Sequence, residues 1–190
     1  YAPVLRRGGT RLYFVYSSPA VSPLPFGLYY ADRADRRSRF GAPVHVPVGD
    51  GTLFFRHAAL SADETELVIG VVGMGNDLHY ATRTDVEGPF GAPSSLSGSN
   101  DPTLVETQPF FSGDSLELFY AVGSTSPDRR VWRRTRSAAL GAWSPAVMVD
   151  LGGDASAPTL SRDGHTIFFG TGSPERIATA ERADLTAAAF

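Results

Sequence analysis

The sequence predicts an all-β fold, a β-propeller in which small four-stranded sheets are arranged radially. Three observations support this. Four tandem copies of a unit of about fifty residues cover the chain. The apolar runs in each copy are short and rich in Phe, Tyr, Val, Ile and Leu, which favour strands. No stretch shows convincing helical periodicity. Repeats of this length with four strands each are typical of propeller blades.

The first anchor of the repeat is a strand, a tight turn and a second strand. In the third copy it reads QPFFSGDSLELFYAV, and the fourth copy has APTLSRDGHTIFFGT. The turns contain ADE, GDS or RDG, in which a short Asp side chain bonds the local backbone. The first copy departs from this pattern, with RRGG at the turn. The four copies of this anchor span residues 2–16, 57–71, 108–122 and 157–171.

The second anchor is a strand that ends in an arginine, followed seven or eight residues later by an aromatic residue. Because the arginine recurs in every copy, we expect it to have a structural role in the blade and not to mark a functional site. That role would be a salt bridge or a contact with a carbonyl at the end of the strand. The arginines are Arg33, Arg83, Arg136 and Arg182, and the aromatic residues are Phe40, Phe90, Trp143 and Phe190.

Each copy therefore has four expected strands, a to d; in the third copy these are 108–111, 116–122, 130–136 and 145–150. Strand b is apolar enough to be buried on both faces, so we expect its central residues, Phe14, Ile69, Phe119 and Phe168, to be buried. The expected blades are residues 1–53, 54–104, 105–153 and 154–190. The fourth blade lacks its last strand. Because propellers avoid exposed edges, this favours a larger propeller of six or more blades over a four-bladed ring.

Composition narrows the possible partners. The net charge of −3 argues against a nucleic-acid surface, which needs a basic face. The absence of Cys excludes disulfides and zinc thiolates. No apolar run approaches the length of a transmembrane helix, so we expect no membrane insertion.

The turn SRDGHTIFF resembles the S-P-D-G signature of WD40-like repeats of the TolB type. The units DLHYATR and PFGAP are similar to the version common in bacterial secreted and periplasmic proteins. The resemblance covers the whole chain and implies the propeller fold. It also implies a periplasmic or extracellular location, but it implies no single function, because the family hosts many roles.

Function is expected in the loops that differ between copies. Strand order places the a–b turns on one face and the d–a and b–c loops on the other, around the channel mouth. On that second face we expect loops 73–77, 97–108, 123–130 and 151–157. The candidate binding residues are polar side chains of these loops and of the d–a connector at residues 49–57: Arg56, His57, Asp77, Asp101, Glu106, Gln108, Asp154 and Ser156. The alternative is that they solvate a wet channel.

Two functional classes remain open. The first is a non-enzymatic binding or scaffold module that takes a protein, peptide or glycan. The second is a glycosidase-like enzyme, whose acid and base would come from Asp50, Asp101, Glu106, Asp150 and Asp154. Neighbouring Gly, Asn or Pro residues favour a turn role for Asp50, Asp101 and Asp154.

No metal, cofactor or catalytic residue is predicted. The four histidines, His45, His57, His79 and His165, lack metal-ligand spacing. We expect His79 and His165 to face solvent. The sequence has neither a nucleophile elbow nor a phosphate-binding loop.

Overall fold

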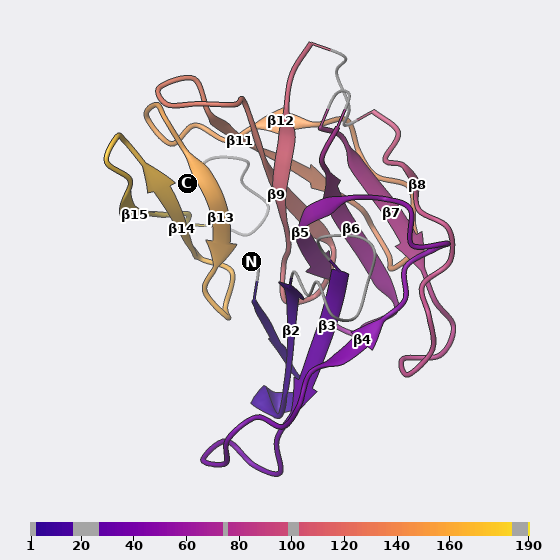
Figure 1. The fold of residues 1–190 in the computed structure, drawn as a ribbon. Helices are drawn as coiled ribbons and strands as arrows, with labels where there is room; N and C mark the ends of the chain where they lie inside the picture. The colour runs from indigo at the N-terminus through magenta and orange to yellow at the C-terminus, as the bar shows by residue number, and fades with distance from the viewer. Residues whose placement is uncertain (1–2, 17–26, 74–75, 99–102, 184–189) are drawn as a thin grey trace.

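The computed structural model describes residues 3–16, 27–73, 76–98, 103–183 and 190. In these residues four antiparallel sheets are arranged around a common axis, as the sequence predicts (Figure 1). The first three sheets have four strands each, and the fourth has three. Strands follow one another across each sheet in chain order, so every connection within a sheet is a hairpin. The expected larger propeller of six or more blades stays a prediction.

We call the sheets blades 1 to 4. Blade 1 contains β1 (Val4–Arg6), β2 (Arg11–Tyr16), β3 (Gly27–Asp32) and β4 (Val44–Val46). Blade 2 contains β5 (Phe55–Leu60), β6 (Glu66–Val71), β7 (Leu78–Thr82) and β8 (Ser94–Ser95). Blade 3 contains β9 (Glu106–Phe111), β10 (Glu117–Val122), β11 (Arg130–Thr135) and β12 (Val147–Met148). Blade 4 contains β13 (Ser156–Leu160), β14 (Thr166–Thr171) and β15 (Arg176–Glu181). Within the described residues the helical content is one 3₁₀ turn, η1 (Arg7–Gly9).

The Ser-x-Asp turn between the first two strands is a closed hydrogen-bonded unit. In blade 3, the Ser112 hydroxyl donates to Asp114 Oδ1 at 2.6 Å and accepts from the Glu117 amide at 2.9 Å. Asp114 Oδ1 also accepts from the Leu116 amide at 3.0 Å. Blades 2 and 4 repeat this arrangement at Ser61 and Ser161. The motif is therefore structural, because it satisfies backbone groups that a tight turn leaves unpaired.

Side chains of the second strand alternate between the two faces of each blade, and the faces between consecutive blades pack on one another. Tyr13 and Val15 of blade 1 share an apolar cluster with Leu67 and Ile69 of blade 2. A second cluster joins blades 2 and 3 through residues that include Val68 and Tyr120. The third joins blades 3 and 4, where Phe119 packs with Ile167 and Phe169. The core thus consists of three interfaces between consecutive blades.

Burial of the four central strand-b residues is confirmed for Ile69 and Phe119, which have no exposed surface. It is wrong for the other two. Phe14 is only half-buried, and Phe168 is 38% exposed. Blades 1 and 4 each have a neighbour on one face only, and these two side chains lie on the face without one. We call these faces the outer face of blade 1 and the outer face of blade 4.

The recurrent arginines stabilise the blades, as expected. In each blade the Nε atom donates to a carbonyl of the a–b turn, at 2.7 Å for Arg33 and 2.9 Å for Arg136. Each guanidinium also lies over the following aromatic ring, 4.4 Å from its centroid at Trp143 and 4.8 Å at Phe190. The contacts of Arg83 and Arg182 are equivalent.

Two of these arginines also form ion pairs with the preceding blade. Arg136 binds Glu66 of blade 2 through both terminal nitrogens, at 2.5 and 2.7 Å. Arg182 binds Glu117 of blade 3 in the same way, at 2.9 and 2.6 Å. We call this contact the arginine clasp. At the first junction, Arg83 instead donates to the Tyr13 hydroxyl at 3.0 Å.

The two loop sets lie on opposite faces, as strand order predicts. The a–b turns contact one another: Arg7 binds Glu64, and the Ala62 amide donates to Ser115 Oγ at 2.7 Å. On the other face, the Glu106 amide donates to the Asn76 carbonyl at 3.0 Å. The Ala155 amide likewise donates to the Arg129 carbonyl. Residues 74–75 and 99–102 of these loops lie outside the described residues.

Candidate binding site at the central channel

The first strands of the four blades line a cavity at the centre of the molecule. Its volume is about 610 Å³, which lies within the range of small-molecule and peptide-side-chain pockets. Most of the wall is apolar and comes from short segments of β1, β5, β9 and β13. The lining residues are Pro3, Val4, Leu5, Arg6, His57, Ala58, Gln108, Pro109, Phe110, Ala157, Pro158, Thr159 and Leu160.

Irregularities in three of these strands shape the wall. The register of β5, β9 and β13 against the next strand shifts, next to His57, Gln108 and Ala157. Gln108 and Ala157 have positive φ values of 54° and 47°. A bulge in a strand redirects the local side chain. Here the Gln108 side-chain oxygen accepts from the Ala157 amide at 2.9 Å and ties blade 3 to blade 4.

His57 is a neutral side chain in the wall of this cavity. Burial, and secondarily the charge of Arg56, lower its pKa from 6.5 to about 4. The Nδ1 atom is shielded from solvent and has no hydrogen-bond partner among the described residues. The ring packs beside Gly70, where a Cβ atom would lie 3.4 Å from Nδ1. At neutral pH His57 therefore presents an uncharged imidazole.

A polar network lies beside the cavity, between blades 3 and 4. Arg129 binds Asp154 through Nε and Nη2 at 3.0 and 2.8 Å, and it binds Glu175 through Nη1 at 3.0 Å. Glu175 in turn accepts from the Ser156 hydroxyl at 2.8 Å. The bonds to Arg129 hold the pKa of Asp154 well below its usual range. Asp154 is thus an ionised hydrogen-bond acceptor, and both of its carboxylate oxygens already bind Arg129.

The structure brings the eight candidate residues together only in part. His57 and Gln108 line the cavity, and Asp154 and Ser156 belong to the Arg129 network. Arg56 is exposed and lies over Phe54, Asp77 is half-buried just before β7, and Glu106 is buried. Asp101 lies outside the described residues.

Sequence reasoning missed Arg129, Glu175 and the apolar wall. Arg129 lies in the expected b–c loop at residues 123–130. The sequence alone does not show that Arg129, and not the adjacent Arg130, forms the network. The apolar wall had a signal, since Pro follows the bulge position in two of the first strands, as Pro109 after Gln108 and Pro158 after Ala157.

Asp50 and Asp150, two of the carboxylates named for a glycosidase-like site, are turn residues. Asp50 Oδ1 accepts from the Thr52 amide at 3.0 Å and from its hydroxyl at 2.7 Å. Asp150 Oδ1 accepts from the Gly152 amide at 3.0 Å. Both side chains are exposed. They cap local turns, as the neighbouring glycines indicate.

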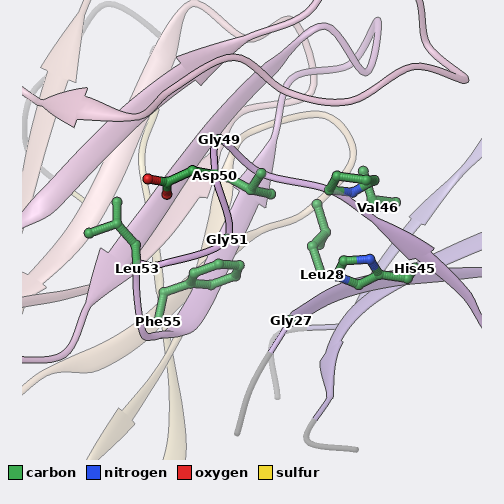
Figure 2. A pocket seen from close by; sticks show the side chains of 11 residues that line it. Gly27, Leu28, His45, Val46, Gly49, Asp50, Gly51, Leu53 and Phe55 are labelled. Atoms are coloured by element: carbon green, nitrogen blue, oxygen red, sulfur yellow. The ribbon is translucent and has the colours of Figure 1, made fainter. Parts of the chain in front are cut away.

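A smaller hollow of about 190 Å³ lies between blade 1 and the segment that leads to β5 (Figure 2). Leu28, Val46, Leu53 and Phe55 form most of its wall. Asp50 and His45 lie on opposite sides of it in Figure 2. The hollow therefore offers no paired polar groups.

The other described histidines do not form a metal site. His165 is exposed, as expected, whereas His79 is half-buried and its Nδ1 atom is shielded from solvent. Among the described residues, no group of three or more His, Asp or Glu side chains could hold a metal ion. Within the same residues, no helix is long and apolar enough to cross a membrane.

No family model matches the sequence, and no curated protein matches it either. Solved structures do match. TolB from Acinetobacter baumannii is 14% identical with a TM-score of 0.56, and the match covers 95% of this chain and 40% of TolB. An endo-arabinase from Bacteroides thetaiotaomicron is 13% identical with a TM-score of 0.67, over 97% of this chain and 74% of the enzyme. A periplasmic gluconolactonase from Pseudomonas aeruginosa is 15% identical with a TM-score of 0.51, and the match covers 97% of this chain and 57% of the gluconolactonase.

These similar proteins include both TolB and enzymes, so the likeness concerns the fold and leaves the activity open. The chain spans only 40% of the length of TolB and 57% of that of the gluconolactonase. The structure and the comparisons together show that this chain has the β-propeller fold of TolB-like proteins.

Proposed function

We propose that the chain is a non-enzymatic binding module that holds an apolar segment of a protein or peptide in the central cavity. The observation that carries the proposal is the composition of the cavity wall. Proline, aliphatic and aromatic side chains predominate, and no carboxylate is among the described lining residues. Binding sites for apolar groups have this character, with a few polar groups that fix orientation.

The polar groups of the wall favour a peptide over a glycan. A glycan buries many hydroxyls, each of which needs a hydrogen-bond partner. The wall contains Arg6, His57, Gln108 and Thr159. Arg6 already donates to the Leu60 and Ser61 carbonyls, and Gln108 accepts from Ala157. Few groups are left for hydroxyls, whereas the apolar surface matches a side chain such as Leu or Phe.

The glycosidase alternative requires two carboxylates about 5–10 Å apart that face a common pocket. Asp154 is held by Arg129, and Asp50 and Asp150 cap exposed turns. These observations support binding in preference to hydrolysis. A periplasmic or extracellular location completes the proposal. It is supported by the TolB-type repeats and by the similar periplasmic gluconolactonase.

A peptide-display selection tests the proposal. We expect the chain to enrich peptides with apolar side chains, and we expect Thr159→Trp, which fills the cavity, to abolish their binding. Thr84→Trp is the matched control, because Thr84 is exposed and does not line the cavity. Enriched peptides that bind Thr159→Trp as well as the unmodified chain would contradict the proposed site. Binding on a glycan array without peptide enrichment would contradict the ligand class.

A further inference from the structure

Arg33 of blade 1 has the geometry of an arginine clasp without the carboxylate. In blades 3 and 4 the clasp arginine reaches back to a glutamate of the preceding blade. Arg33 keeps the other two contacts, the 2.7 Å bond to the Gly9 carbonyl and the position 4.5 Å from the Phe40 ring. Its guanidinium is therefore placed like those of Arg136 and Arg182. No described residue bonds its terminal nitrogens, which lie toward the outer face of blade 1.

Blade 4 carries the matching carboxylate on its own outer face. In blade 3, Glu117 on the second strand lies opposite Thr135 on the third strand. Blade 4 reverses this pair, because Thr166 is on the second strand and Glu181 is opposite on the third. Directly opposed residues of antiparallel strands share a face, with Cβ atoms about 5 Å apart. Glu181 therefore presents its charge where Glu117 does in blade 3, but it is exposed.

Apolar side chains on the two outer faces are uncovered. On blade 1, Leu5 is 52% exposed and Tyr16 is 49% exposed. On blade 4, Phe168 is 38% exposed and Ile177 is 84% exposed. These two residues line a hollow of about 290 Å³ that reaches Gly170. Such uncovered apolar surface with a charged residue beside it is typical of an interaction site.

The junction between blades 3 and 4 shows what fits the outer face of blade 4. Phe119 occupies in blade 3 the strand position of Phe168, as the pairing register shows. Phe119 is fully buried because Ile167 and Phe169 of blade 4 cover it. The corresponding residues of blade 1 are Leu12 and Phe14 on β2. Blade 1 therefore has the side chains that would cover Phe168.

We propose that blade 4 of one copy of this chain docks on blade 1 of a second copy, head to tail, with Glu181 clasped by Arg33. None of the three apolar clusters joins blade 4 to blade 1 within a copy. The two faces carry opposite charges at Arg33 and Glu181 and apolar side chains at equivalent strand positions, and both belong to the same chain. Two such junctions close a ring of eight blades, within the range known for propellers.

Charge reversal tests the junction in the chain of 190 residues. Light scattering coupled to size exclusion should give the mass of a dimer for the unmodified chain. Arg33→Glu and Glu181→Arg should each raise the dissociation constant at least roughly tenfold, because each places like charges together in a desolvated interface. The double variant restores opposite charges at every junction and should restore association. Arg39→Glu is the matched control, since Arg39 is an exposed arginine of the same blade.

A disulfide trap gives an independent result if a charge variant fails to fold. The chain contains no Cys, so Leu12→Cys and Phe168→Cys each introduce a single thiol. Mixing the two variants under oxidation should produce a covalent dimer, as the equivalent contact of Phe119 and Ile167 predicts. A monomer at the highest soluble concentration would overturn the proposal. So would a dimer that neither charge reversal weakens, or thiols that do not cross-link.

Discussion

Replacing Arg136 by Met should strongly destabilise the chain. Arg136 and Glu66 have no exposed side-chain surface, and two short hydrogen bonds join them. Removing the arginine leaves a buried carboxylate whose described remaining donor is the Tyr80 hydroxyl, at 2.7 Å. Breaking a buried ion pair in this way costs about 3–5 kcal/mol. The loss of the bond to the Ser115 carbonyl contributes about 1 kcal/mol of that cost.

Arg33→Met is the matched control for this prediction. Arg33 makes the same carbonyl bond and the same ring contact, but none of the described ion pairs includes it. Its replacement should cost about 1–2 kcal/mol. Urea unfolding, followed by tryptophan fluorescence, measures the free energy of unfolding of both arginine variants. The comparison requires that the dependence of this free energy on urea concentration, the slope m, is the same in both. Glu66→Met in the Arg136→Met background should recover most of the loss, because an apolar pair replaces the ion pair. Equal losses for the two single arginine variants would refute the clasp as a stabilising contact.

Three further predictions concern single residues. Phe119→Ala should cost about 3–5 kcal/mol, while Phe168→Ala, at an exposed position, should cost about 1 kcal/mol; similar losses in urea unfolding would contradict the described outer face. Because the pKa of His57 falls from 6.5 to about 4 on folding, stability should decline by about 3 kcal/mol as pH falls from 6.5 to 4. His57→Gln should remove this part of the pH dependence, and an unchanged profile would show that His57 does not cause it. Ser112→Ala should cost about 1–2 kcal/mol, measured by thermal unfolding, because the Glu117 amide loses its acceptor; a smaller loss than at an exposed Ser would contradict the turn role.

The repeated local features of the fold could be predicted from the sequence. The Ser-x-Asp turn and the contact between the arginine and its following aromatic ring recur in the chain, and each of these contacts lies within one blade. Their contacts are therefore fixed by short-range spacing. The assignment of Phe14 and Phe168 to the core failed because burial depends on which face has a neighbour. A strongly apolar strand gives no indication of that.

The contacts between blades could not be predicted from the sequence. Glu66 and Arg136 are far apart in the chain, and Glu66 differs from other acidic residues only in its strand position. The Arg129 network is similar, because it joins the b–c loop of blade 3 to Glu175, just before β15, and to Asp154, just before β13. The partners of Asp154 and Ser156, which are Arg129 and Glu175, follow only from three-dimensional packing.

The claim that the central cavity binds a peptide can be tested most directly by amide hydrogen exchange. The chain would be measured alone and with the highest-affinity peptide from the display selection. We predict slower exchange in the wall segments at residues 4–6, 57–58, 108–110 and 157–160, and no change in the a–b turns on the opposite face. Protection confined to the a–b turns or to the outer faces of blades 1 and 4, with the cavity wall unchanged, would contradict it.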